Sequence, residues 1–382
     1  MTRMLDPALS LLKQLIAIDS VNPSLVPGAA GEGPIAEVVA AHMRREGLDV
    51  HVEEAAAGRP NVIGVLEGTQ PGPSLMFCGH LDTVGVEGMA APFDPVERDG
   101  RIYGRGAQDM KAGLAAMIDA ARLVQARGWR RGRLVVAAVV DEEYASLGAD
   151  ALVRGWPADA AIVTEPTELQ IGVAHKGFAW LEVDVRGRAA HGSRPRDGRD
   201  AIIRMGRVLQ RLEALDTDLQ GRPPHPIMGA PSLHASMIDG GREWSVYPDR
   251  CRLRMERRTI GGEVAEDVEA EVRGILDDLR LLDPGFEAAS RLMFSRPAYE
   301  IPANHPLTAA LRAATASGGS APEEIGMSFW TDAAVLAQAG IPSLVFGPGG
   351  AGLHGVEEYV RADDVVACRD VLAALARRWC GE

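Results

Sequence analysis

Two polar side chains follow a short apolar stretch in the first quarter of the chain. Residues 75–78 read Leu-Met-Phe-Cys, and Gly79 then leads to His80 and Asp82. Residues two apart on an extended segment point to the same face, which places this histidine and this carboxylate side by side. Histidine is a common zinc ligand, and a nearby carboxylate is the usual group that fixes its orientation. The alternative is an ordinary strand end carrying a polar pair.

More carboxylates follow other predicted strands. Glu142 and Glu143 come after the apolar run 133–140, and Glu165 follows the run 160–164. With Asp141, the first pair makes three adjacent like charges, which need either open solvent or cations to offset their repulsion. Asp109 lies in the glycine-rich segment 104–113, just ahead of a predicted helix, where capping that helix is the alternative to metal binding.

One more histidine, His354, lies in a glycine-rich loop directly after the predicted strand 343–346. The carboxyl ends of the strands in an open, largely parallel α/β sheet meet at one edge, where ligands bind. We therefore expect one cluster at that edge, formed by His80, Asp82, Asp109, Glu142, Glu143, Glu165 and His354. A set of histidines and carboxylates at one edge predicts a metal site.

Alternating helices and strands must position these residues. Helices are predicted at 5–19, 35–46, up to about 127 after the loop 104–113, 305–316, 331–338 and 363–379, and strands at 48–53, 61–66, 75–78, 133–140, 160–164 and 343–346. A different order, strand, helix, strand, strand, helix, strand, is predicted at 179–186, 200–215, 232–237, 251–255, 262–279 and 286–294. That order is typical of a ferredoxin-like module. We place the domains at 1–174, 175–293 and 294–382, with the middle one inserted in the first.

The composition restricts the class of protein. The chain has 382 residues, of which 46% are hydrophobic and 24% charged, as in globular proteins with more than one domain. A net charge of -13 disfavours binding to nucleic acid and to anionic membrane surfaces. The cysteines form no Cys-x-x-Cys pair, and no signal peptide or membrane span is visible. A reduced cytoplasm is the expected location.

Five segments, in order along nearly the whole chain, resemble one known family. They are Gly-His-Leu-Asp-Thr-Val at 79–84, Gly-Arg-Gly-Ala-Gln-Asp-Met-Lys-Ala-Gly at 104–113, Asp-Glu-Glu at 141–143, Thr-Glu-Pro-Thr at 164–167 and Gly-Leu-His-Gly-Val-Glu-Glu-Tyr at 352–359. Together they look like the dinuclear zinc hydrolases that include acetylornithine deacetylase, succinyl-diaminopimelate desuccinylase, aminoacylase and glutamate carboxypeptidase. The resemblance implies an α/β fold: a mostly parallel-sheet zinc-hydrolase catalytic domain with an inserted ferredoxin-like α+β lid or dimerisation domain.

The resemblance also implies a role for each residue of the cluster. One metal would be held by His80 and Glu165, the other by Glu143 and His354, and Asp109 would bridge both. Asp82 would orient His80, and Glu142 would be the general base. The implied cofactors are two Zn²⁺ ions, and Co²⁺ or Mn²⁺ could occupy the same ligands. The peptide bond after Asp109 is expected to be cis.

Other segments resemble the family's substrate site. His191, in the stretch 187–195, would reach into the active site of a partner subunit and help to bind the oxyanion; a solvated histidine at a strand end is the alternative. Arg258 is the expected ligand of the substrate's free carboxylate. Thr331, Asp332 and the backbone of Gly349 are the remaining substrate-binding candidates. Ser245 and Gly261 replace the family's usual Asn and Pro, which leaves the substrate open.

The predicted function is therefore that of a two-metal amide hydrolase that removes an acyl group from an N-acyl-L-amino acid, with water activated by Glu142. A metallo-carboxypeptidase or dipeptidase is the alternative within the family, because a peptide bond presents the same carbonyl. A non-catalytic metal- or ligand-binding relative is the alternative of another class. The expected partners are a small N-acyl amino acid or dipeptide and a second copy of the chain, which would form a homodimer through the inserted domain.

Overall fold

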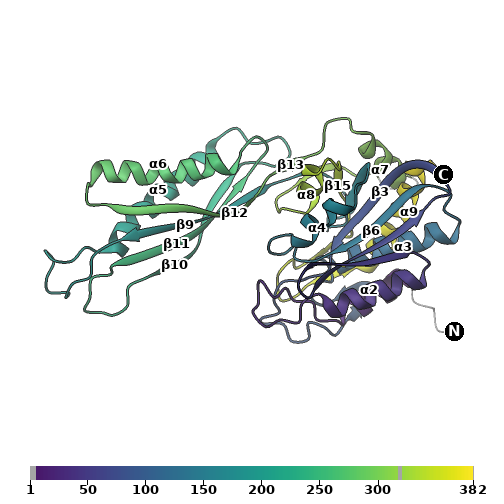
Figure 1. Ribbon diagram of the computed structural model, residues 1–382, viewed down its shortest axis with the longest axis horizontal. Helices are drawn as coiled ribbons and strands as arrows, with labels where there is room; N and C mark the ends of the chain where they lie inside the picture. The colour runs from purple at the N-terminus through teal and green to yellow at the C-terminus, as the bar shows by residue number, and fades with distance from the viewer. Residues whose placement is uncertain (1–5, 317–320, 382) are drawn as a thin grey trace. The chain divides into compact units, whose positions relative to one another are not determined.

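The computed structural model describes residues 6–316 and 321–381, which form two compact units (Figure 1). Unit 1 holds the described residues up to Val173, those from Ile301 to Ile325, and those from Thr331 onward; unit 2 consists of Ala174–Glu300 and Gly326–Trp330. The sequence pattern predicts the inserted segment at 175–293. Unit 2 extends further because its last long strand continues to Arg296 and a short strand, Tyr299–Glu300, follows.

The main sheet of unit 1 has the strand order β1-β2-β6-β3-β7-β15-β8, and β14 also pairs with β8. The strands are β1 (Asp49–Ala56), β2 (Arg59–Glu67), β3 (Gln70–His80), β6 (Arg131–Val139), β7 (Ala160–Val163), β8 (Ile171–His175), β14 (Glu324–Met327) and β15 (Ser343–Val345). The central pairs β3–β6, β3–β7 and β7–β15 are parallel, whereas β1–β2, β2–β6 and β15–β8 are antiparallel. The central strands thus confirm the predicted parallel sheet, and the antiparallel pairs lie toward its edges.

Helices lie on both faces of this sheet. They are α1 (Pro7–Ile16), α2 (Gly33–Arg45), α3 (Lys111–Ala126), α4 (Leu147–Gly155), α7 (Pro306–Ala316), α8 (Ala333–Gln338) and α9 (Ala362–Cys380). Asn61 and Gly64 of β2 point to opposite faces because their positions differ by three, an odd number. Asn61 bonds Gly148 of α4, while Met43 of α2 fills the space beside Gly64. The sequence pattern does not predict α4 or β8.

A second, small sheet in unit 1 joins two loops that are far apart in sequence. Its strand order is β16-β17-β5-β4, from β4 (Val96–Arg98), β5 (Arg101–Tyr103), β16 (Gly350–Ala351) and β17 (Tyr359–Arg361). Tyr103 of β5 pairs with Tyr359 of β17. The segment before Asp109 is thereby held beside the segment after His354. No signal in the sequence predicts these strands, because each is very short and the two strand pairs meet only through the long-range pairing of β5 with β17.

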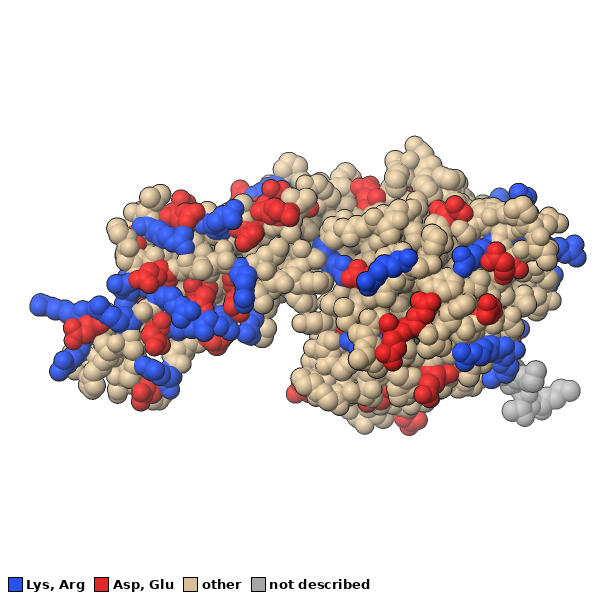
Figure 2. Space-filling view, viewed as in Figure 1, with Lys and Arg blue, Asp and Glu red and all other residues tan. Residues whose placement is uncertain are grey.

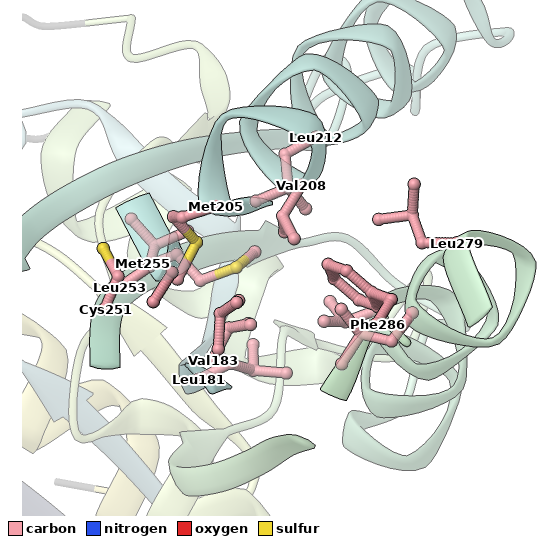
Figure 3. Packing of buried hydrophobic residues seen from close by; sticks show 14 of the residues in the cluster. Leu181, Val183, Met205, Val208, Leu212, Cys251, Leu253, Met255, Leu279 and Phe286 are labelled. Carbon is pink, nitrogen blue, oxygen red and sulfur yellow. The ribbon is translucent and has the colours of Figure 1, made fainter. Parts of the chain in front are cut away.

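Unit 2 has the predicted ferredoxin-like order. An antiparallel sheet, β10-β11-β9-β12, is packed against two helices. The elements are β9 (Gly177–Arg186), α5 (Ala201–Gly221), β10 (Ser232–Gly240), β11 (Arg250–Thr259), α6 (Ala265–Leu282) and β12 (Glu287–Arg296), and β13 (Tyr299–Glu300) pairs with the end of β8. Figure 3 shows the apolar cluster between the sheet and these helices, with Val183, Leu253 and Phe286 among its members. Across residues 6–316 and 321–381, no helix combines the length and the hydropathy that crossing a membrane requires.

Candidate metal centre

Three parallel strands carry acidic or histidine side chains to one edge of the main sheet. His80 is the last residue of β3, Glu142 and Glu143 follow β6, and Glu165 follows β7. Ligand atoms of His80, Glu142 and Glu165 lie within 4.8 Å of one another, as do those of His80, Asp109 and Glu143. The structure therefore brings the side chains together as parallel strand ends predict.

Asp109 lies between the two histidines of the cluster. Its Oδ1 is 3.1 Å from Nε2 of His80, and its Oδ2 is 3.2 Å from Nε2 of His354. The helix cap is Met110 rather than Asp109, and the Asp109–Met110 peptide bond is cis, as expected. The capping alternative is therefore wrong: both carboxylate oxygens face the histidines, in the arrangement of a bridging ligand.

Each histidine also faces a glutamate. His354 Nε2 lies 3.2 Å from Glu143 Oε2, and His80 Nε2 lies 3.6 Å from Glu165 Oε1 and 3.9 Å from Glu142 Oε2. The His80 side chain is fully buried and that of His354 is 55% exposed. The cluster thus has a buried end at His80 and an end open to solvent at His354.

Asp82 supports this cluster through two kinds of contact. Nδ1 of His80 lies 2.9 Å from the main-chain oxygen of Asp82 and 3.7 Å from its carboxylate. The carboxylate accepts the backbone N–H groups of Glu142 and Glu143, each at 3.2 Å. The ring is therefore oriented mainly by the Asp82 backbone, while the Asp82 carboxylate holds the turn that presents the two glutamates.

The crowded acids shift one another's proton affinities. Burial, followed by the charge of Asp109, raises the pKa of Glu143 to about 7, and burial together with Glu165 raises the pKa of Glu142 well above its usual value. Burial alone would lower the pKa of His80, but the negative charge of Glu165 and the contact with Asp109 raise it well above the ordinary value. These shifts show that the carboxylates face too little positive charge from the chain itself.

The donor set fits two divalent cations. The main-chain oxygen beside His80 Nδ1 can only accept, so that nitrogen carries the proton and Nε2 is left as a ligand atom. Among the described residues, no hydrogen-bond donor reaches Oε1 of Glu143 or Oε1 of Glu165, although both atoms are buried. Buried charges in proteins are paired or coordinate metals, and carboxylates with imidazoles are suitable ligands for zinc.

Glu358 organises the loop that carries Asp109. It lies in the segment 352–359, and the sequence predicts no role for it. It is buried, and its carboxylate accepts the backbone N–H groups of Gly106, Gln108 and Asp109 at 2.8–3.0 Å and the side chain of Arg105 at 2.7 Å. Because Glu358 immediately precedes β17, the small sheet brings it to this loop. A sequence pattern alone does not reveal this pairing.

In unit 2, two adjacent arginines differ in their burial and in their ion-pair partners. Arg257 is fully buried and forms ion pairs with Glu263 and Glu271. Arg258 points to the other face of β11, bonds Glu256 at 2.7 Å and retains 30% side-chain exposure. Only Arg258 is thus accessible to a ligand.

The loop residues predicted to bind substrate are largely engaged within the chain. The Thr331 hydroxyl is buried and accepts the N–H of Ala333, and the Gly349 N–H donates to Asp364 at 3.1 Å. The N–H of Gly349, predicted to bind an anion, is thus engaged by Asp364 in this structure, and its contact with substrate stays a prediction. Asp332 is buried, and its charge contributes to the raised pKa values of Glu142 and Glu165.

His191 lies in unit 2, where residues 190–192 pair with the segment 245–247. It is exposed, and its Nδ1 lies 2.8 Å from the Ser193 hydroxyl. Its ring is therefore accessible at a point where the backbone is held by an ordered bridge.

Known structures with the same fold include two peptidases. A tripeptidase from Staphylococcus aureus aligns with a TM-score of 0.81 and 22% identity over the whole of both chains. A metallo-carboxypeptidase from Sulfolobus solfataricus aligns with a TM-score of 0.81 and 16% identity, covering 98% of this chain and 99% of the other. These likenesses show the fold.

Sequence comparison shows the family. An acetylornithine deacetylase from Myxococcus xanthus is 33% identical over an alignment of 394 positions that covers 98% of each chain. An N-formyl-4-amino-5-aminomethyl-2-methylpyrimidine deformylase from Bacillus subtilis is 28% identical, covering 98% of this chain and 95% of the other. Residues 76–378 match the peptidase family M20/M25/M40. The chain therefore belongs to peptidase family M20/M25/M40 and is a metal-dependent hydrolase of amide or peptide bonds.

Proposed function

We propose that this chain removes an acyl group from an N-acyl-L-amino acid at a two-metal centre. The observation that carries the proposal is the Asp109 carboxylate, whose two oxygens face His80 and His354 at 3.1 and 3.2 Å. Similarity to the deacetylase from Myxococcus xanthus, which extends over 98% of each chain, supports deacylation as the reaction.

The ligands divide into two groups around the bridging carboxylate. We assign His80 and Glu165 to one metal, Glu143 and His354 to the other, and Asp109 to both. Zinc suits this set of nitrogen and oxygen ligands, and cobalt or manganese could replace it. The metals would polarise the scissile carbonyl and lower the pKa of the attacking water.

Glu142 is the proposed general base. Its Oε2 lies 3.9 Å from His80 Nε2, farther than the nearest oxygens of Asp109 and Glu165, and its side chain is 10% exposed compared with 4% for Glu165. A carboxylate beside the ligands, rather than among them, can take a proton from water and transfer it to the leaving nitrogen. The Asp82 carboxylate holds the Glu142 backbone in place for this transfer.

The substrate's free carboxylate is assigned to Arg258, because its neighbour Arg257 is buried in ion pairs. Arginine can bind a carboxylate through two parallel hydrogen bonds. His191 is the proposed oxyanion ligand supplied by a partner subunit. Asp332, whose charge acts on Glu142 and Glu165, remains a candidate for shaping the substrate site.

We further propose a homodimer formed through unit 2. β10 is an edge strand of its sheet, and its exposed residues include Met237 and Ile238 at 56% and 55% exposure. An exposed apolar edge is a suitable surface for pairing with another chain. The four cysteines are buried thiols, and no disulfide joins them in the described part of the chain, which agrees with a reducing cytoplasm as the proposed location.

A substrate panel tests the reaction. Zinc-loaded protein is assayed with N-acetyl and N-succinyl amino acids and with dipeptides, and release of the free amino acid is measured. We expect turnover of at least one acylamino acid. Turnover of dipeptides alone would instead establish the peptidase alternative. The same metal centre could serve either reaction, because an acyl amide and a peptide bond present the same carbonyl.

Mixing two variants tests the role of the partner subunit. His191→Ala and Glu142→Ala should each be inactive alone, whereas dimers containing one chain of each should combine an intact Glu142 with an intact His191 in one site. We expect recovered activity after subunit exchange. An active monomer in sedimentation would contradict this role of His191.

A further inference from the structure

Behind the metal centre, in unit 1, lies a buried polar network that the mechanism above does not use. Arg59 at the start of β2 is 8% exposed, and Glu32, Asp141 and Asn22 are fully buried. Arg59 binds both oxygens of Glu32, through Nε at 2.9 Å and through Nη2, and its Nη1 donates to Asp141 Oδ1 at 2.7 Å. One guanidinium therefore joins two buried carboxylates.

Asn22 connects this ion-pair network to Asp82. Its Nδ2 donates to Asp82 Oδ2 at 2.7 Å and to Asp141 Oδ1 at 3.1 Å. Its Oδ1 accepts the backbone N–H of Ser24 at 2.8 Å, a group that can only donate, so the orientation of the amide is determined by its partners. The Asn22 backbone is itself bonded to Thr83, next to Asp82.

This network acts on the proposed catalytic residues in two ways. The Asp82 carboxylate, held by Asn22, accepts the N–H groups of Glu142 and Glu143. Asp141, which precedes these two glutamates, has a φ of 69°, in the left-handed region that residues other than glycine rarely adopt. The bonds from Arg59 and Asn22 to its side chain offset the cost of this conformation.

We propose that Asn22 and Arg59 are positioning residues of the metal centre, acting through Asp82 and Asp141 to fix where the general base and a metal ligand stand. This inference rests on the function proposed above. Groups outside the ligand set commonly change metal affinity or activity about 10–100-fold when they are mutated.

The chain offers a matched control in a second arginine network. Arg369 of α9 is also 8% exposed and joins three acids, Asp6 at 2.7 Å, Asp370 at 2.9 Å and Asp119 at 3.2 Å. None of these acids contacts a residue of the metal cluster through a hydrogen bond or ion pair that the described residues show. Arg59→Lys and Arg369→Lys therefore make the same chemical change in two networks, of which one leads to Asp82.

The test measures zinc affinity of the metal-free protein by calorimetry, together with kcat and KM of the loaded enzyme. We expect Asn22→Ala and Arg59→Lys to weaken zinc binding and lower kcat about 10-fold or more, with a smaller change in KM. Arg369→Lys should retain wild-type zinc affinity and kcat even if its unfolding temperature falls. Ser24→Ala, which removes hydroxyl contacts to Asp141 and Arg59, is a milder variant and should change both quantities in the same direction.

Two results would overturn the positioning role. One is wild-type zinc affinity and kcat in folded Asn22→Ala or, if that variant does not fold, in Ser24→Ala. The other is an equal loss in Arg59→Lys and Arg369→Lys, since it would reflect general stability. Zinc binding by the wild type without turnover of any panel substrate would contradict the proposed function instead, while the calorimetric comparison would still decide the role of the network.

Discussion

Two groups of carboxylates, one in each unit, are similarly shielded from water but differ in their partners. Glu182 and Asp184 on β9 have side chains 9% and 15% exposed. Arginines of β11 and β12 lie 3.3–3.4 Å from the Glu182 carboxylate, and an arginine of β11 also pairs with Asp184. Acidic and basic side chains also alternate over this region of the surface in Figure 2. Asp109 in the metal cluster is 16% exposed, so exposure alone does not distinguish the two groups.

The difference lies in the source of positive charge. In the part of the chain that the structure describes, no lysine or arginine forms an ion pair with Asp109, Glu142, Glu143 or Glu165; only the two histidines approach them. Buried like charges without cations are costly, whereas a carboxylate between arginines is stabilised by the chain itself. A cluster that lacks its own cations is therefore the better indication of a metal site.

The largest expected effect comes from removing the base. Glu142→Gln should lower kcat about 10²–10⁴-fold because the water proton has no acceptor, while both metals remain bound. Turnover and metal content are measured on the same samples. Unchanged turnover at full metal content would remove Glu142 from the mechanism and favour the non-catalytic interpretation.

A second large effect should follow substitution of the bridging ligand. Asp109→Asn removes the negative charge that lies between His80 and His354. We therefore expect the zinc stoichiometry to fall below two and activity to fall with it. Metal analysis after dialysis gives the stoichiometry. Full retention of both ions would contradict a bridging role.

Metal removal should make stability depend on pH. The pKa of Glu143 is raised from 4.5 to about 7 in the metal-free fold, so the folded chain binds this proton more tightly than the unfolded chain does. Metal-free protein should therefore lose on the order of 2 kcal/mol as the pH rises from 4.5 to 7. The loss continues above pH 7, because the contacts with Asp109 and Glu143 raise the pKa of His354 from 6.5 to about 10.

Denaturant unfolding at several pH values, with and without a chelator, measures this dependence. Zinc-loaded protein should show a flatter profile, since the bound ions keep the glutamate ionised. A metal-free profile that instead gains stability between pH 4.5 and 7 would contradict the assignment of excess negative charge to the cluster.

The smallest effect is expected in the arginine-paired group of unit 2. Glu182→Gln should cost about 1 kcal/mol or less, because its partners Arg254 and Arg291 are 43% and 68% exposed and can be solvated. Thermal unfolding and metal content are the measurements. A loss of bound zinc in this variant would mean that the two carboxylate groups are not as different as their partners indicate.

Much of the fold follows from local patterns in the chain. The apolar runs that end in His80 and Glu165 are β3 and β7, and the alternation along 179–186 is part of β9. The predicted helices occur with ends shifted by a few residues; α5, for instance, continues to Gly221. Hydrophobic periodicity determines such elements because it reflects which side chains each element can bury.

Very short strands and buried polar residues could not be predicted from the sequence, for a physical reason. β5 and β17 have three residues each, and their pairing joins two short antiparallel strand pairs although 256 positions separate Tyr103 from Tyr359. Glu358 and Asn22 look like surface polar residues in the sequence, and only their contacts show them to be buried beside Asp109 and Asp82.

The sequence by itself determined the chemistry that is available: histidines and carboxylates at strand ends, in an order that resembles one hydrolase family. Only the tertiary structure decided how they are used. In the folded chain, the two oxygens of Asp109 face different histidines. The Asp82 carboxylate accepts the N–H groups of the Glu142–Glu143 turn, and Arg257 is buried while Arg258 stays accessible. The direction of a side chain depends on contacts between segments far apart in the chain, and a linear pattern does not contain these contacts.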